Sequence, residues 1–192
     1  MTAFKPNSLP VLIGSLPLDD HLEAVKLIHE YTPDIPLWPQ LPSRKEEGML
    51  LQFLPGMPGV KEKDGKVFVD AESTEFESEF LSFFEEYLMV SEGGATLEDS
   101  RFSMSSPEAD GFIAFLDFIG SYRDSVTALK GQVTGPVTFC TTLVDQAGRA
   151  LFYNEQLRDA AVKLLALKAQ WQARRMAEIK EKTAAFRKEL LK

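Results

Sequence analysis

A short apolar run, followed directly by a helical pattern, constrains the fold of this chain more than any other feature. The run LPVLIGSLP (Leu9–Pro17) is typical of a buried strand of a parallel sheet, and Gly14 marks its end. A helix-start signature follows at Asp20, and apolar residues then recur at helical spacing as far as Tyr31. A second extended segment, DIPLWPQLP (Asp34–Pro42), comes next. Strand, helix and strand in this order predict a βαβ unit and an α/β fold with a parallel sheet.

The remaining patterns extend this alternation. GKVFVD (Gly65–Asp70) predicts a hairpin arm or a short edge strand. An acidic helix follows, with aromatic residues on one face at Phe76, Phe80, Phe83, Phe84 and Tyr87. Ser106 and Pro107 predict the start of another helix, as its cap and its first residue. Asn154 predicts the cap of a long helix that extends from Gln156 to about Leu191.

The stretch KGQVTGPVTFC (Lys130–Cys140) carries conflicting signals. Its β-branched and aromatic residues favour a strand, whereas Gly131, Gly135 and Pro136 are residues that a strand interior normally avoids. We expect a strand whose carboxyl end turns close to a ligand, and a β-bulge is the alternative.

Composition restricts the classes of function. The chain has 192 residues and a formal net charge of -8, which disfavours binding to nucleic acid or to an anionic membrane. Its one cysteine, Cys140, excludes an internal disulfide and fits a reducing compartment. No signal peptide and no membrane span is indicated, so a soluble cytoplasmic protein is expected. The acidic residues concentrate between Asp70 and Asp110, where we expect a solvated face.

Sites in α/β folds form where parallel strands end, so the candidate site residues lie at the predicted strand ends. They are Gly14, Ser15, Trp38, Gln40, Thr134, Gly135 and Thr138. Each position also has a purely structural interpretation: a tight turn at Gly14, a packed corner at Trp38 and a bulge at Gly135. No metal ligand is assigned, because neither of the two histidines has a Cys or His at ligand spacing.

Four motifs together resemble the methionine synthase/uroporphyrinogen decarboxylase superfamily. They are VLIGSLP, IPLWPQLP, GQVTGPVTF and the helical LLALKAQWQ, and they span most of the chain. The form TGPVT is most similar to the cobalamin-independent methionine synthase-like branch. Matching is weakest in the acidic region.

The resemblance implies a (β/α)8 barrel and a set of binding residues. In methionine synthases, the positions that match Ile13, Gly14 and Ser15 line the homocysteine site. The strand that matches TGPVT borders the folate side, which nominates Thr134, Gly135 and Thr138. Trp38 and Gln40 are assigned to substrate binding only by the strand-end argument. Leu18 stands where relatives often carry a histidine.

The family's zinc ligands lie in the second half of the barrel, beyond Lys192, so no cofactor is expected on this chain alone. A full barrel needs about 250 residues, and only about four βα units are found here. We therefore expect residues 1–192 to form a single domain, the N-terminal half of a barrel, with an acidic insertion at about residues 70–106. Its open edges predict a homodimer or a second half-barrel chain as partner.

Three functions remain open. The first is a methionine synthase-like methyltransferase, inactive alone, that transfers a methyl group from a donor to a small-molecule thiol such as homocysteine. The second is a uroporphyrinogen decarboxylase-like or corrinoid methyltransferase-like protein, although IGSLPLDD offers no arginine for a tetrapyrrole. The third is a truncated or split half-barrel subunit without catalysis.

Overall fold

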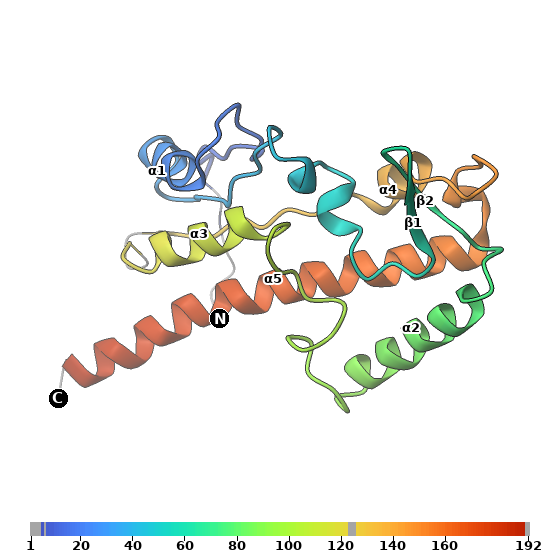
Figure 1. The fold of residues 1–192 in the computed structure, drawn as a ribbon. Helices are drawn as coiled ribbons and strands as arrows, with labels where there is room; N and C mark the ends of the chain where they lie inside the picture. Colours follow the sequence, from blue (N-terminus) through green and yellow to red (C-terminus); the bar gives the residue numbers. More distant parts are fainter. Residues whose placement is uncertain (1–4, 6, 123–125, 191–192) are drawn as a thin grey trace. The chain divides into compact units, whose positions relative to one another are not determined.

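The computed structural model describes residue 5, residues 7–122 and residues 126–190, with backbone alone from 180 onward. This described part is mixed α/β (Figure 1). Its helices are α1 (His21–Tyr31), α2 (Phe76–Ser91), α3 (Asp110–Ile119), α4 (Pro136–Thr142) and α5 (Glu155–Leu190). Its strands are β1 (Val60–Lys63) and β2 (Lys66–Val69). Short 3₁₀ turns lie at η1 (Lys45–Glu47), η2 (Leu51–Phe53) and η3 (Leu151–Tyr153).

The chain divides into two compact units, each built from segments that are distant in sequence. Unit 1 comprises residues Met1–Gly48, Ser106–Gln132 and Gln172–Lys192, and unit 2 comprises Met49–Ser105 and Val133–Trp171. The single domain expected from the sequence stays a prediction.

In unit 1, helix α1 begins where the sequence predicts. The side chain of Asp20 accepts a hydrogen bond of 2.7 Å from the backbone N–H of Glu23, which caps the helix. Helix α1 buries Ala24, Val25 and Ile28, and it packs against α3. The predicted start of helix α3, with Ser106 as cap and Pro107 as first residue, is wrong. The helix begins at Asp110, with Ala109 as its cap residue.

The predicted buried strand at Leu9–Pro17 is wrong. The segment is extended, but only Ser15 forms a bridge, and Val11, Leu12 and Ile13 are 49%, 38% and 86% exposed. The apolar run is therefore not enclosed by a sheet within the described residues. A residue-level pattern cannot show this, because burial of a strand depends on what covers both of its faces.

Unit 2 contains the predicted hairpin arm. Strand β2 pairs antiparallel with β1, with Val60 opposite Val69 and Lys63 opposite Lys66. The two turn residues, Asp64 and Gly65, both have positive φ, which suits a tight hairpin turn.

The strand predicted within Lys130–Cys140 is wrong from Pro136 onward. Gly135 is the cap residue of helix α4, and Pro136 is its first residue. Proline suits this position because its φ is already helical and the first N–H of a helix has no intrahelical partner. The Gly-Pro pair therefore starts a helix here, and the β-branched residues after it do not continue a strand.

The acidic helix and the long helix are confirmed as α2 and α5. In unit 2, Phe83 of α2 packs edge-on against Phe102, with ring centroids 5.3 Å apart. The side chain of Asn154 accepts a hydrogen bond from the N–H of Leu157 at 3.1 Å and so caps α5, as predicted. Among the described residues, none of the helices combines the length and apolar character that crossing a bilayer requires.

Candidate functional site

Three extended segments of unit 1 pair in parallel. The N–H of Gln40 donates to the carbonyl of Gly14 at 2.9 Å, and the N–H of Leu16 donates to the carbonyl of Gln40 at 3.1 Å. On the other side, the N–H of Lys130 donates to the carbonyl of Pro36 at 3.0 Å. These contacts form isolated parallel bridges and not a continuous ladder. They place the segment that contains residues 36–40 between the other two, so the carboxyl ends of all three point the same way.

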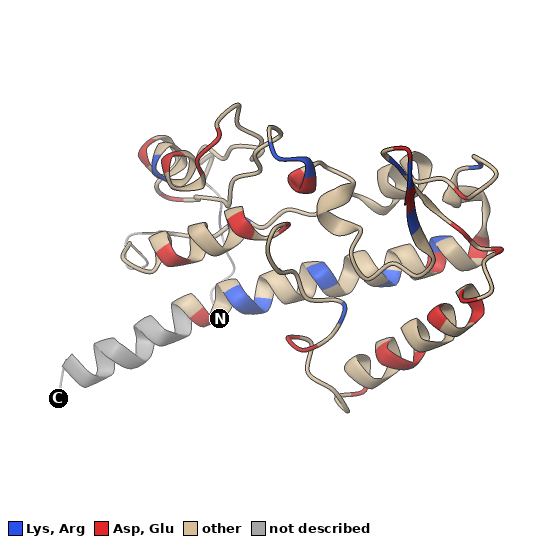
Figure 2. Ribbon diagram, in the orientation of Figure 1, with Lys and Arg blue, Asp and Glu red and all other residues tan. Residues whose placement is uncertain are grey.

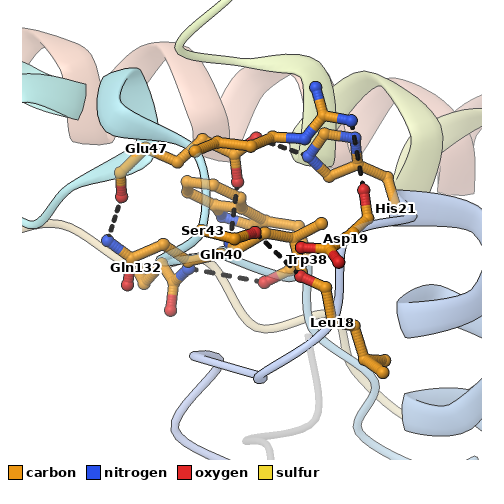
Figure 3. A network of polar contacts seen from close by, with 10 residues as sticks. Leu18, Asp19, His21, Trp38, Gln40, Ser43, Glu47 and Gln132 are labelled. Atoms are coloured by element: carbon orange, nitrogen blue, oxygen red, sulfur yellow. Dashed lines mark hydrogen bonds and ion pairs between the residues drawn. The ribbon is translucent and has the colours of Figure 1, made fainter.

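A polar cluster lies at these carboxyl ends, and we call it the Gln40 cluster. It comprises Ser15, His21, Gln40 and Glu47. The hydroxyl of Ser15 donates to Gln40 Oε1 at 2.7 Å. Nε2 of Gln40 donates to the backbone carbonyl of Glu47 (Figure 3). The amide of Gln40 is thus held at both ends. Ser15 is exposed and Gln40 is half-buried, so the cluster is partly open to solvent.

The carboxylate of Glu47 is the buried anchor of the cluster. The residue is fully buried, and its two carboxylate oxygens have separate partners. Oε1 contacts Nε2 of His21, and Oε2 accepts from the backbone N–H of Leu41 at 2.8 Å (Figure 3). His21 is the first residue of α1, and its imidazole contacts Glu47 of η1. The contact between this carboxylate and the imidazole fixes η1 beside Gln40.

Two further contacts join the loop before η1 to the loop before α1. Ser43 Oγ donates to the carbonyl of Leu18 at 3.1 Å, and an Arg44 guanidinium N–H donates to the carbonyl of Asp19 at 3.1 Å (Figure 3). The chain on both sides of the His21–Glu47 contact is therefore tied together.

Gly14 allows the central packing of this edge. Its φ is +134°, and a Cβ at this position would lie 2.3 Å from Oε1 of Gln132. Gln132 in turn donates from Nε2 to the carbonyl of Trp38 at 3.4 Å (Figure 3). The backbone conformation therefore favours a glycine, and any side chain here would also displace the end of the Gln132 side chain.

The structure brings together some of the predicted site residues. Gly14, Ser15 and Gln40 meet in unit 1, as described above. Ile13 is 86% exposed, and its carbonyl accepts a hydrogen bond of 2.8 Å from Nζ of Lys130. Burial lowers the pKa of that lysine.

Trp38 lies in the core of unit 1, so the prediction that it presents a surface to a ligand needs correction. It is 0% exposed, and its Nε1 donates to Oε1 of Gln172 at 3.1 Å. Its ring packs edge-on against Phe112. The structure therefore shows a packed corner at Trp38 and not a ring that is open for stacking on a ligand.

The other three predicted site residues, Thr134, Gly135 and Thr138, belong to unit 2. Thr134 is buried, and its hydroxyl donates to the backbone carbonyl of Met49. Gly135 and Thr138 are exposed at the first turn of α4. None of the contacts within unit 2 joins these three residues into a cluster comparable to that around Gln40 in the described residues.

Sequence reasoning missed the His21–Glu47 pair. It considered His21 only as a metal ligand and did not single out Glu47. One signal was present: KEE follows the extended LWPQLP after a short polar loop, which brings Glu47 close to the end of that segment. The burial of Glu47 depends on the partner helix, and no spacing rule predicts it.

Unit 2 contains a pocket of about 320 Å³, lined by Asp145, Arg149, Ala150, Tyr153, Asn154, Glu155 and Gln156. Asp145 organises its loop: Oδ1 accepts from the N–H groups of Ala147 and Arg149, both at 2.9 Å. Its Oδ2 accepts from Arg149 Nε at 3.0 Å. Burial acts to raise the pKa of Asp145, but these hydrogen bonds and the guanidinium outweigh it and lower that pKa below its ordinary value.

This pKa predicts acid sensitivity of unit 2. A carboxyl whose pKa is lower in the folded state stabilises the fold above its unfolded pKa of about 3.9, and that stability is lost as the pH falls through the folded pKa. We expect Asp145→Asn to lower the urea midpoint at pH 7 and to approach the wild-type midpoint as the pH falls below about 4. A gap between the two midpoints that stays constant with pH would contradict this. The exposed Glu85→Gln serves as the control.

Neither cysteine nor metal chemistry is indicated by the described residues. Cys140 is buried in α4, and burial raises the pKa of its thiol despite the opposing charge of Arg158. Both features lower its reactivity. Within the described ranges, no three His, Cys, Asp or Glu side chains come together in a way that could hold a metal ion.

Comparison of the chain with family models, curated proteins and solved structures finds no match. The geometry of the Gln40 cluster, together with the motifs that build it, is therefore the basis of the functional proposal.

Proposed function

We propose that this chain is the N-terminal half of a cytoplasmic methyltransferase-like barrel that resembles the methionine synthases, and that its Gln40 cluster binds a small thiol substrate such as homocysteine. One observation carries the proposal. The segment around Ser15 pairs in parallel with the segment around Gln40, and both carry motifs of the resemblance. The segment that begins at Lys130 pairs in parallel with the segment around Gln40. Neighbouring parallel segments with polar carboxyl ends are what a binding edge of such a barrel requires.

The cluster suits the polar part of an amino-acid substrate. Ser15 supplies an exposed hydroxyl, and the Gln40 amide, held by Ser15 and Glu47, supplies a fixed dipole. A binding group that is held in place before the ligand arrives loses less entropy on binding. The described residues do not fit a zinc site, so thiol activation by zinc is not assigned to this chain.

The test is a titration of the full chain with homocysteine, followed by NMR. We expect saturable shifts, and about tenfold weaker binding for Gln40→Ala, because one hydrogen bond and its fixed geometry are lost. Glu46→Gln, an exposed neighbour in η1, is the matched control and is expected to bind like wild type. Absence of saturable shifts, or equal binding by Gln40→Ala, would overturn the proposal.

A half-barrel subunit that needs a second chain is a further candidate, and the exposed first segment favours it. Val11, Leu12 and Ile13 expose apolar side chains in a segment that, among the described residues, pairs through a single bridge. Such an edge is typically covered by another strand. Light scattering is expected to detect a dimer, and a chain that stays monomeric at high concentration would contradict this candidate.

A further inference from the structure

The apolar face of α2 is wider than the core of unit 2 requires. Its core side is formed by Phe83 and Val90, which are buried. At 100° per residue, Phe80, Phe84, Leu88 and Leu81 continue this face around the helix, as the spacing of the sequence shows. Leu81 and Leu88 are 61% and 52% exposed. A stripe of large apolar side chains thus lies outside the core.

This stripe forms one wall of a groove of about 550 Å³, which we call the α2 groove. It is lined by Phe76, Glu77, Phe80, Leu81 and Phe84 of α2, and by Ala71 and Gln156. The aromatic rings form a ladder, with centroids 5.4 Å apart between Phe76 and Phe80 and 4.9 Å apart between Phe80 and Phe84. Aromatic walls of this kind are typical of surfaces that receive an apolar side chain.

The charge of α2 has one sign. Its 16 residues include four glutamates and no Lys or Arg. Figure 2 shows this as red segments without blue along α2. Glu79 accepts from the N–H of Gly59, and Glu86 pairs with Arg101. Glu77 lies in the groove and Glu85 is exposed beside it, so both are placed to contact an incoming cation.

One lysine of unit 2, Lys163, lies against two aromatic rings of α2. Nζ of Lys163 lies 5.5 Å from the ring centroid of Phe84 and 5.3 Å from that of Tyr87. Both distances are within the range of cation–π attraction.

We propose that the α2 groove binds an amphipathic helix of a partner protein whose apolar stripe is flanked by Lys and Arg. An apolar groove with an acidic rim complements such a helix in both shape and charge. A second copy of the chain, docked α2 against α2, would instead bring the glutamates of both helices together, and like charges disfavour that contact.

The test uses a fluorescently labelled peptide as long as α2, with Leu and Phe at helical spacing and Lys on both flanks. Its anisotropy is measured against the full chain. We expect saturable binding that weakens as salt is added, and no binding by a matched peptide in which Glu replaces Lys. Leu81→Ser is expected to bind about tenfold more weakly, because one apolar contact is lost. Met89→Ser, 51% exposed on the opposite side of α2, is the control and should bind like wild type.

A second variant separates charge from packing. Glu77→Lys keeps the apolar wall and reverses one rim charge, so it should weaken binding of the Lys peptide, and circular dichroism confirms that each variant is folded. Equal binding of the Lys and Glu peptides, or equal effects of Leu81→Ser and Met89→Ser, would overturn the proposal. It would also be overturned by a dimer of the chain that Leu81→Ser dissociates, since the groove would then hold a second copy.

Discussion

Trp38→Ala is expected to lower the free energy of unfolding of unit 1 by about 3–5 kcal/mol. The side chain is 0% exposed, its ring centroid lies 5.7 Å from that of Phe112, and its Nε1 donates to Gln172. Alanine would leave a cavity the size of an indole and remove that hydrogen bond. The measurement is urea unfolding followed by circular dichroism.

Fluorescence can assign this loss to one unit. The chain has two tryptophans, Trp38 in unit 1 and Trp171 in unit 2. Fluorescence of Trp38→Ala therefore reports unit 2 alone, and Trp171→Phe makes the emission report unit 1. Tyr153→Ala, at a residue 84% exposed, is the control and should change stability by less than about 0.5 kcal/mol.

The opposite outcome would assign Trp38 to the binding site. If Trp38→Ala changes stability by less than about 1 kcal/mol but weakens binding of homocysteine, the side chain acts on a ligand and not in the core.

Glu47→Ala is expected to destabilise unit 1 by about 2–4 kcal/mol. The carboxylate is fully buried and accepts from the N–H of Leu41, while its other oxygen contacts His21. Alanine leaves both partners without an acceptor in a buried position. The carbonyl of residue 47, which holds Gln40, would also lose its fixed place. Chemical unfolding measures the stability, and the homocysteine titration measures the effect on the cluster.

A double-mutant cycle with His21→Ala isolates the contact between the two side chains. We expect the loss in Glu47→Ala/His21→Ala to be smaller than the sum of the single losses, because either variant alone already breaks the contact. Glu46→Ala, at the exposed neighbour, is the control for η1. Strict additivity of the two single variants would show that His21 and Glu47 do not stabilise each other.

Elements with strong local signals could be predicted from the sequence. The cap at Asp20, the hairpin arm that begins at Gly65, the aromatic stripe of α2 and the cap at Asn154 all act through residues within a few positions. Helix starts and tight turns depend on such neighbours, so their signals survive in the sequence.

Elements whose state depends on distant residues could not be predicted from the sequence. The segment Leu9–Pro17 has the composition of a buried strand, but no sheet encloses it within the described residues. The same limit applies to the site. The meeting of Ser15 and Gln40 could be expected because both end extended segments. The burial of Trp38 could not, because pattern alone does not separate a strand end that faces solvent from one that faces the core.

The sequence by itself determined the mixed α/β character, the caps at Asp20 and Asn154, the acidic helix and which segments carry the polar motifs. Only the tertiary structure decided that His21 meets Glu47, that Gln132 packs over Gly14 and that the apolar face of α2 is left partly uncovered. The reason is physical: capping and periodicity are set by neighbours along the chain. Burial and side-chain pairing are set by whichever remote segment packs alongside, and that segment is selected by the free energy of the whole fold.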